Sequence, residues 1–427
     1  MIKKFEKIKN VAGELVLPGD KSISHRAVML ASLAKGKSLI HNLSNSEDVF
    51  STKKCFSELG ASIIDNGDKI EIVGRGHKGF IGSENELYAG NSGTTARLLM
   101  GILSAQNFSS TITGDNSLSS RPMRRVIETL ALMGVQTKAT SNQFLPIKIY
   151  PPPEIIPIKY ELLVPSAQVK SAILLAGLHS EGSTEVIENI PTRNHTELML
   201  GLKTINKDKK IISVVSKQNY PKANEYFIPS DISTASFFIV LTLLTKQSEL
   251  LLKNISLNET RTGIIKVLQE MGGDIEILNE NIFNGEKSGD VLIKSSELRN
   301  VKIDNTIIPN IIDEIPILAV AGLFADSSFE IRNASELRKK ESDRINSICY
   351  NLRLLGLKVE EYEDGFKLDG DIKKQQIIFE SFGDHRIAMA FSILSLMLNE
   401  GASVNNFECV NISNPNFINQ LKSIACF

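Results

Sequence analysis

Positively charged side chains gather where apolar helices are expected to begin. The amino end of a helix carries partial positive charge and free backbone N–H groups. A cation beside such an end creates a site for phosphate or carboxylate, which an arginine binds through two parallel hydrogen bonds. The pattern therefore predicts binding of a compact polyanion. The basic residues beside expected helix starts are Lys21, Arg26, Arg97, Arg121, Lys170, Arg193 and Arg386, with Lys340 and Arg344 at a further helix.

Two carboxylates stand close in sequence to these positions. Asp313 precedes an apolar helix, and Glu341 directly follows Lys340. Simple capture of an anion gains nothing from carboxylates beside it, which argues against a protein that only binds anions. Two plainer interpretations stay open. The polar helix starts, Asp313 included, could be ordinary N-caps, or the chain could be a non-catalytic anion-binding protein.

The composition is that of an ordinary globular protein. The 427 residues carry a formal net charge of -1, with 42% hydrophobic and 23% charged residues, which is unlike a disordered, fibrous or membrane chain. The low net charge and 6% aromatics without tryptophan argue against nucleic-acid binding. The charged start Met1–Lys7 lacks the apolar core of a secretory signal, and no apolar run approaches the ~18 residues of a membrane span. We expect a cytoplasmic monomer that binds no membrane.

The four cysteines, Cys55, Cys349, Cys409 and Cys426, are scattered along the chain. They lack the short spacings of a zinc or redox site, and no histidine cluster accompanies them. We expect reduced thiols, mostly in the core, and no metal site.

A helical segment recurs six times and indicates repeated α/β modules. The starts lie roughly 65 to 80 residues apart, which is longer than the period of small helical repeats. Hydrophobic–glycine pairs that would close helices precede β-rich stretches and support the same period. The six helical segments are Ser22–Leu30, Ser92–Met100, Ser166–Leu175, Ser233–Phe238, Asp313–Val320 and Asp384–Ala390. The hydrophobic–glycine pairs are Leu59-Gly60, Met133-Gly134, Leu200-Gly201, Met271-Gly272 and Leu355-Gly356. The expected strands include Ser62–Ile64, Lys69–Val73, Val291–Ile293 and Lys358–Glu360.

The two halves of the chain begin alike. Pro18 to Ser22 and Pro229 to Ser233 share the pattern P-x-D-x-S. We therefore expect two similar domains of three modules each, residues 14–227 and 228–427, the second completed by residues 1–13. Coincidental similarity among apolar helices is the alternative.

An ordered series of motifs resembles the enolpyruvylshikimate-phosphate synthase family over nearly the whole chain. The resemblance implies an α/β enolpyruvyl transferase fold, or inverse α/β barrel, with two similar domains of three βαβαββ units that close on their substrates. The matching stretches are Leu17–Ala27, Gly90–Thr94, Gly114–Met123, Pro165–Ser171, Thr192–Glu197, Ile312–Glu314, Arg338–Arg344 and Asp384–Met389.

The resemblance also implies a reaction and its ligands. The family moves the enolpyruvyl group of phosphoenolpyruvate to the 5-hydroxyl of shikimate 3-phosphate without metal or other cofactor, in the shikimate pathway of aromatic amino-acid biosynthesis, and glyphosate inhibits it at the phosphoenolpyruvate site. The implied shikimate 3-phosphate ligands are Lys21, Ser22, Arg26, Ser166, Ala167, Gln168, Thr192, Arg193, Asp313 and Lys340, and the implied phosphoenolpyruvate ligands are Lys21, Gly93, Arg121, Gln168, Arg344 and Arg386.

The reaction adds a hydroxyl to an enol double bond and then eliminates phosphate through a tetrahedral intermediate. We expect Asp313 to accept the hydroxyl proton, while Lys21 and Glu341 share the proton on carbon. Shikimate 3-phosphate should bind first and favour domain closure.

Two departures and one rival family bear on this interpretation. The stretch Asn411–Pro415 lacks the lysine and the aromatic residue found there in plant and enteric relatives, and Glu336 stands where those have asparagine. The rival transfers enolpyruvyl to UDP-N-acetylglucosamine and usually carries a cysteine in the loop that here reads Gly114–Ser120, without cysteine.

Overall fold

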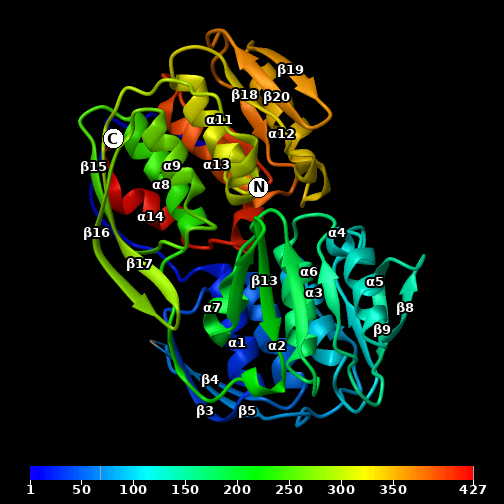
Figure 1. Cartoon of the computed structure of the whole chain (residues 1–427). Helices are drawn as coiled ribbons and strands as arrows, with labels where there is room; N and C mark the ends of the chain where they lie inside the picture. The colour runs from blue at the N-terminus through cyan, green and yellow to red at the C-terminus, as the bar shows by residue number, and fades with distance from the viewer. Residues whose placement is uncertain (68, 427) are drawn as a thin grey trace. The chain divides into compact units, whose positions relative to one another are not determined.

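The computed structural model describes residues 1–67 and 69–426, which form two compact units (Figure 1). The N-terminal unit comprises Gly19–Ile228 and Ile282–Glu286, and the C-terminal unit comprises Met1–Pro18, Pro229–Asn281 and Lys287–Phe427. The chain leaves the C-terminal unit after Pro18, five residues beyond the expected boundary at residue 13. The reason is strand β2 (Asn10–Val16), which pairs in parallel with β15 (Glu249–Ser256) of that unit.

The N-terminal unit consists of three four-stranded sheets with one repeated order. In each sheet the first two strands are parallel, and the third and fourth follow antiparallel. The sheets are β14 (Glu225–Phe227), β3 (Lys35–His41), β5 (Lys69–Arg75), β4 (Ser62–Asp65); β6 (Leu87–Tyr88), β7 (Ser110–Thr113), β9 (Phe144–Tyr150), β8 (Gln136–Thr140); and β10 (Lys159–Glu161), β11 (Thr184–Glu188), β13 (Lys210–Val215), β12 (Lys203–Lys207).

Helices alternate with these strands as the βαβαββ pattern requires. Each repeat has one buried helix after its first strand and a second helix after its second strand. In the first repeat the chain order is permuted, because its first strand, β14, comes from the end of the unit. The helices are α1 (Lys21–Leu33), α2 (Glu47–Glu58), α3 (Gly93–Leu103), α4 (Asn116–Ser119), α5 (Arg124–Leu132), α6 (Ala167–Gly177) and α7 (His195–Leu200), with the short turn η1 (Lys217–Asn219).

The C-terminal unit varies the same plan. Its sheets are β16 (Asp274–Phe283), β17 (Glu286–Lys294), β15, β2, β23 (Ala425–Cys426); β18 (Phe329–Ile331), β20 (Gly365–Asp369), β19 (Lys358–Tyr362); and β1 (Lys3–Phe5), β22 (Ala402–Asn405), β21 (Ile378–Glu380). In the middle sheet a single parallel bridge, Arg299 to Asp326, takes the place of the first strand. The start of the chain thus supplies strands to two of the three sheets.

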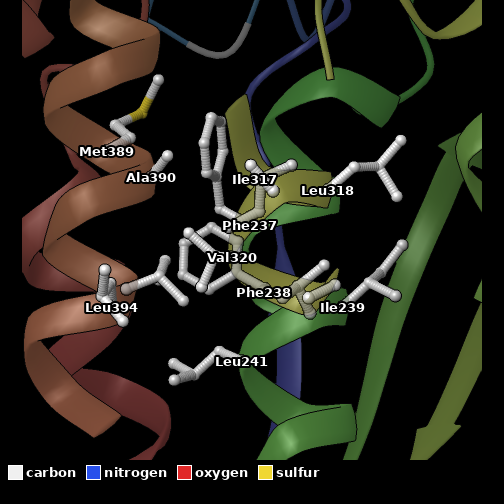
Figure 2. Close-up of a cluster of buried hydrophobic side chains, with 14 of the residues drawn as sticks. Phe237, Phe238, Ile239, Leu241, Ile317, Leu318, Val320, Met389, Ala390 and Leu394 are labelled. Carbon is white, nitrogen blue, oxygen red and sulfur yellow. The ribbon is translucent and has the colours of Figure 1, made fainter. Parts of the chain in front are cut away.

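Three apolar helices fill the centre of the C-terminal unit. Helices α8 (Ile232–Leu244), α11 (Ile315–Phe324) and α13 (His385–Met397) are buried along nearly their whole length. Figure 2 shows Phe237 and Phe238 of α8 meeting Val320 of α11 and Leu394 of α13. Burial of each such side chain contributes about 1.5–3 kcal/mol. The surrounding elements are α9 (Gly263–Glu270), α10 (Ile308–Ile311), α12 (Arg344–Leu354), α14 (Phe417–Ile424) and the turns η2 (Asn305–Ile307), η3 (Ser335–Lys339) and η4 (Phe407–Ile412).

The predicted helix ends and strands are confirmed. All five glycines of the hydrophobic–glycine pairs have positive φ angles, between 59° at Gly201 and 97° at Gly272, as glycine after a helix should. The four expected strand segments lie within β4, β5, β17 and β19. The predicted α/β class and the repeated unit are confirmed with them.

Cysteine placement agrees with the expectation of core thiols. Cys55, Cys349 and Cys409 are buried, whereas Cys426 is exposed. Burial raises the pKa of each buried thiol to about 12, so these three are poor nucleophiles near neutral pH.

Among the helices of residues 1–67 and 69–426, none is by itself long and apolar enough to span a membrane. The bent pair Asn305–Ile311 and Ile315–Phe324 would be so only by its combined length and composition.

A cluster of three rings should make the stability of the N-terminal unit sensitive to acid. His179 contacts His77 and Tyr220 at centroid distances of 5.0 and 5.2 Å. Both ring nitrogens of His179 are buried without a hydrogen-bond partner among the described residues, and burial lowers its pKa to about 3. The folded chain therefore keeps this ring neutral, whereas the unfolded chain protonates it near pH 6.5. The free energy of unfolding should fall as the pH drops from about 6.5 towards 3.

The variant His179→Phe keeps the ring packing but cannot be protonated. Urea unfolding at pH 7.5 and pH 4.5 should show a smaller acid loss for the variant, by on the order of 2 kcal/mol. An equal acid loss in both proteins would contradict this account of His179.

Candidate functional site

The start of α1 anchors the first predicted ligand, Lys21. Asp20 caps the helix by accepting from the amide of Ile23 at 2.9 Å. The Lys21 ammonium pairs with Asp48 Oδ2 of α2 at 2.8 Å, while Asp48 Oδ1 is buried without a hydrogen-bond partner among the described residues. Lys21 is thus held at one carboxylate oxygen. Asp48 lies in none of the motifs, so no sequence signal pointed to it.

The start of α3 brings together two predicted phosphoenolpyruvate ligands, Gly93 and Arg121. Arg121 donates to Asn91 Oδ1 at 2.6 Å and to Ser117 Oγ at 2.9 Å. Gly93 is the first residue of α3, and an added Cβ there would stand 2.6 Å from Arg97 Nη1 and 3.8 Å from Arg121 Nη1. The absence of a Cβ therefore lets Arg97 approach the start of α3 closely, with Arg121 beside it, and two guanidinium groups together favour an anion.

Arg97 connects this group to α6. Its Nη1 donates to Gln168 Oε1 at 3.0 Å, and Gln168 Nε2 donates to Thr94 Oγ1 at 3.1 Å. Gln168 directly follows Ala167, the first residue of α6, and the preceding Ser166 caps that helix by accepting from an amide N–H. Gly93, Arg121 and Gln168 therefore lie around one place, together with Ser166 and Ala167 at the start of α6.

Arg26 lies deeper than expected for a substrate ligand. Only 4% of the residue is exposed. Its Nε donates to Thr196 Oγ1 at 2.7 Å, its Nη2 to Ser171 Oγ at 2.8 Å and its Nη1 to the Ser22 carbonyl oxygen at 2.9 Å. Burial lowers its pKa to about 10. The contacts show Arg26 tying Ser22 and α1 to α6 and α7.

Lys170 does not contribute an available cation, contrary to its position beside a predicted helix start. Its side chain is fully buried, and its Nζ lies 2.7 Å from both Glu188 Oε2 and Glu197 Oε1. Glu188 in turn accepts from Thr192 Oγ1 at 2.5 Å. Burial raises the pKa of Glu188, with Lys170 opposing that shift. The group fixes the loop that carries Thr192 and the predicted ligand Arg193.

Removing the Lys170 ammonium should destabilise the chain strongly. Lys170→Met keeps the length of the side chain but leaves Glu188 and Glu197 buried without their cation. Loss of one partner of a buried ion pair costs about 3–5 kcal/mol. Urea unfolding at neutral pH measures the effect, with Lys210→Met of the exposed Lys210–Glu161 pair as the control. Equal unfolding free energies for the two variants would contradict this account.

Asp313 lies in a dense ion-pair cluster of the C-terminal unit. Its Oδ1 is 3.1 Å from Lys340 Nζ and 3.1 Å from Arg344 Nη1, and its Oδ2 is 3.9 Å from Arg386 Nη2. The alternative role as an N-cap is not supported, because Glu314 occupies the cap position of α11 and no side chain caps that helix. Four predicted site residues therefore meet here.

Arg344 joins the two carboxylates predicted to be catalytic. Its three nitrogens face three carboxylates: Nη1 faces Asp313, Nη2 lies 2.6 Å from Glu341 Oε2, and Nε lies 2.7 Å from Asp384 Oδ2. Burial works to lower the pKa of Arg344, but the charges of Asp384, Glu341 and Asp313 outweigh it and raise the pKa. The arginine is therefore a permanent cation shared by Asp313 and Glu341.

The prediction that helix-start amides stay free for anions is wrong at α8 and α13 of the C-terminal unit, where Asp231 and Asp384 hold the cap positions. Glu314 holds the cap position of α11 without a side-chain capping hydrogen bond. Asp231 and Asp384 accept amide N–H groups themselves, so these helix ends are already matched by negative charge. In the N-terminal unit Asp20 likewise caps α1, whereas the caps of α3 and α6 are neutral serines. The two units therefore differ in the charge of the cap at two of their three central helices.

The predicted ligands divide between the units in a consistent way. Residues of the N-terminal unit are mostly cations and hydroxyls, and those of the C-terminal unit combine cations with carboxylates. The first group is Lys21, Ser22, Arg26, Gly93, Arg121, Ser166, Ala167, Gln168, Thr192 and Arg193, and the second is Asp313, Lys340, Glu341, Arg344 and Arg386.

Known proteins match nearly the whole chain. The 3-phosphoshikimate 1-carboxyvinyltransferase of Petrotoga mobilis is 49% identical over 96% of this chain and 96% of that protein, and that of Oceanobacillus iheyensis is 46% identical with the same coverage of both. The solved structure of EPSP synthase from Acinetobacter baumannii has a TM-score of 0.87 at 38% identity, covering 99% of this chain and 98% of that one.

A more distant structure and a family model complete the comparison. The enolpyruvyl transferase NikO from Streptomyces tendae has a TM-score of 0.78 at 14% identity, covering 99% of this chain and 97% of that one, and it shares the fold alone. The model of the family EPSP synthase (3-phosphoshikimate 1-carboxyvinyltransferase) matches residues 5–421. This chain therefore has the enolpyruvyl transferase fold and belongs to the EPSP synthase family.

Proposed function

We propose that the chain transfers the enolpyruvyl group of phosphoenolpyruvate to the 5-hydroxyl of shikimate 3-phosphate and releases phosphate. The observation that carries the chemistry is the cluster of Asp313, Lys340, Glu341 and Arg344, in which carboxylates able to move protons share cations within 3.1 Å. In a protein that only captured anions, these carboxylates would repel the ligand and weaken its binding. The cluster thus supports a catalyst over an anion-binding protein on the same scaffold.

The cations of the N-terminal unit are proposed to hold the substrate anions. The two substrates together carry about six negative charges. Arg121 and Gln168, beside Gly93 at the start of α3, suit the phosphate or carboxylate of phosphoenolpyruvate. Ser166, at the start of α6, and the loop at Thr192 suit the phosphate of the shikimate substrate.

Proton transfer is proposed to begin at Asp313. Its carboxylate takes the proton of the 5-hydroxyl as the hydroxyl oxygen bonds to C2 of phosphoenolpyruvate, and Lys21 and Glu341 share delivery of a proton to C3. The product of this step is a tetrahedral intermediate. Return of the C3 proton restores the double bond while the bond from C2 to the phosphate oxygen breaks, which releases inorganic phosphate.

Phosphate release tests the proposal directly. The purified chain with both substrates should release inorganic phosphate and form the enolpyruvyl ether in equal amounts. Omission of shikimate 3-phosphate, or its replacement by UDP-N-acetylglucosamine, should abolish release. Binding of both substrates without release would favour the anion-binding alternative, and release with the nucleotide sugar would favour the rival transferase.

Closure of the domains around the substrates stays a prediction. Small-angle scattering should give a smaller radius of gyration with both ligands than without them, and an unchanged radius would oppose it. The same measurement gives the molecular mass in solution and so checks the expected monomer.

A further inference from the structure

A chain of buried polar groups leads from Arg386 into the C-terminal unit. Arg386 Nη1 lies 3.3 Å from Glu314 Oε1 and donates to the carbonyl oxygen of Asp313 at 3.0 Å. Ser233 Oγ of α8 contacts the same Glu314 oxygen at 2.5 Å, and Arg261 Nη2 contacts Ser233 Oγ at 2.5 Å. Glu314 is 1% exposed. The starts of α8, α11 and α13 are joined through this one carboxylate.

The direction of the hydrogen bonds in the chain is fixed. A guanidinium has only donors, and a hydroxyl has a single proton. Ser233 must therefore accept from Arg261 and donate its proton to Glu314. Glu314 Oε1 then accepts from both Ser233 and Arg386, while Oε2 is buried without a hydrogen-bond partner among the described residues. Oε1 of Glu314 is therefore the acceptor that holds Arg386.

We propose that Glu314 is a positioning residue, which with Ser233 and Arg261 fixes the guanidinium of Arg386 for phosphoenolpyruvate. The inference rests on the proposed function, because it assumes the phosphoenolpyruvate contact of Arg386. A free arginine side chain loses much rotamer freedom when it binds. Nη1 is held by Glu314 and by the Asp313 carbonyl, so the guanidinium is oriented in advance and the ligand contact uses its other edge. The hydrogen bond from Nη1 to the Asp313 carbonyl oxygen also places Arg386 relative to Asp313, the proposed base.

If the network were merely structural, its loss would change KM for both substrates alike or change only the stability of the chain. The Michaelis constants therefore distinguish a positioning role from a structural one. Ser233→Ala removes the hydroxyl that orients Glu314 and should raise KM for phosphoenolpyruvate about tenfold, with KM for shikimate 3-phosphate changed less than about twofold. Ser233→Thr retains a hydroxyl and should restore the wild-type KM. Glu314→Gln keeps the shape but weakens the hold on Arg386, and should raise the same KM.

The matched control is Ser392→Ala on α13, the helix of Arg386. Ser392 is also buried, and its hydroxyl donates to the Ala388 carbonyl oxygen. The variant Ser392→Ala should therefore keep the wild-type KM for both substrates. Equal rises of both Michaelis constants in Ser233→Ala, or a failure of Ser233→Thr to restore KM, would overturn the inference.

Binding measurements keep the inference separate from the proposed function. Phosphoenolpyruvate, added with shikimate 3-phosphate, should protect the chain against heat, and Ser233→Ala should need about tenfold more phosphoenolpyruvate for half-maximal protection. Absence of phosphate release in the wild-type chain would overturn the proposed function alone. Equal half-maximal concentrations for Ser233→Ala and the wild-type chain would overturn the positioning role whatever the turnover.

Discussion

Asp313→Asn should lower kcat about 10³-fold, within the range that loss of a general base produces, while substrate affinity changes little. The amide keeps the shape of the carboxylate and still accepts a hydrogen bond from Lys340, which lies 3.1 Å from Asp313 Oδ1. It cannot take up the proton of the attacking hydroxyl. The loss should therefore appear at saturating concentrations of both substrates, in steady-state phosphate release.

The control for this variant is Asp304→Asn. Asp304 is an exposed residue that caps η2 by accepting the amide of Thr306 at 2.9 Å, a role that asparagine also fills. Its kcat should match the wild-type value. If Asp313→Asn retained wild-type kcat and only raised KM, Asp313 would be a binding residue and the base would lie elsewhere.

Local sequence signals predicted the repeated architecture because each is a property of a short segment. A glycine after an apolar helix, as at Gly60 or Gly356, reports a left-handed residue wherever the helix packs. Alternating apolar residues, as in Lys69–Val73, report a strand with one buried face. These signals required no knowledge of tertiary contacts, and the structure confirms them.

The partners of the candidate site could not be predicted in the same way. Asp48 meets Lys21 only because α2 packs against α1, and Arg261 meets Ser233 only because the segment before α9 reaches the start of α8. Neither residue lies in a recognisable motif. Lys170 shows the converse case, since a basic residue beside a predicted helix start is fully buried between two glutamates.

The charge of the residue that caps a helix could not be weighed from the sequence pattern alone. Serine and aspartate both cap helices well, so a sequence pattern treats Ser166 and Asp384 as equivalent. Their effect on a nearby anion is opposite, because aspartate adds a full negative charge where serine adds none. In the C-terminal unit Arg344 pairs with Asp384 at 2.7 Å and offsets that charge, so this helix start is part of an ion-pair cluster.

Arg344→Lys should damage both folding and turnover, although it retains the positive charge. Arg344 is 1% exposed and reaches Asp313, Glu341 and Asp384 with different nitrogens. A lysine ammonium is a single point of charge and cannot reproduce this planar fork. At least one buried carboxylate would lose its partner, at a cost of about 3–5 kcal/mol in the free energy of unfolding. With Asp313 and Glu341 no longer held together, kcat should fall about 10²-fold or more.

Arg338→Lys is the matched control for Arg344→Lys, because its guanidinium also pairs with two carboxylates, Asp343 and Glu361, but is partly exposed. Solvent screens such pairs, so this variant should lose at most about 1 kcal/mol and keep wild-type kcat. Urea unfolding and steady-state phosphate release should be measured on both variants. The comparison distinguishes the effect of losing the buried guanidinium of Arg344 from the effect of replacing any arginine by lysine. Equal unfolding free energies for the two variants, with wild-type kcat in Arg344→Lys, would mean that the buried carboxylates do not need the guanidinium. That result would contradict the role of Arg344 in holding Asp313 and Glu341 together.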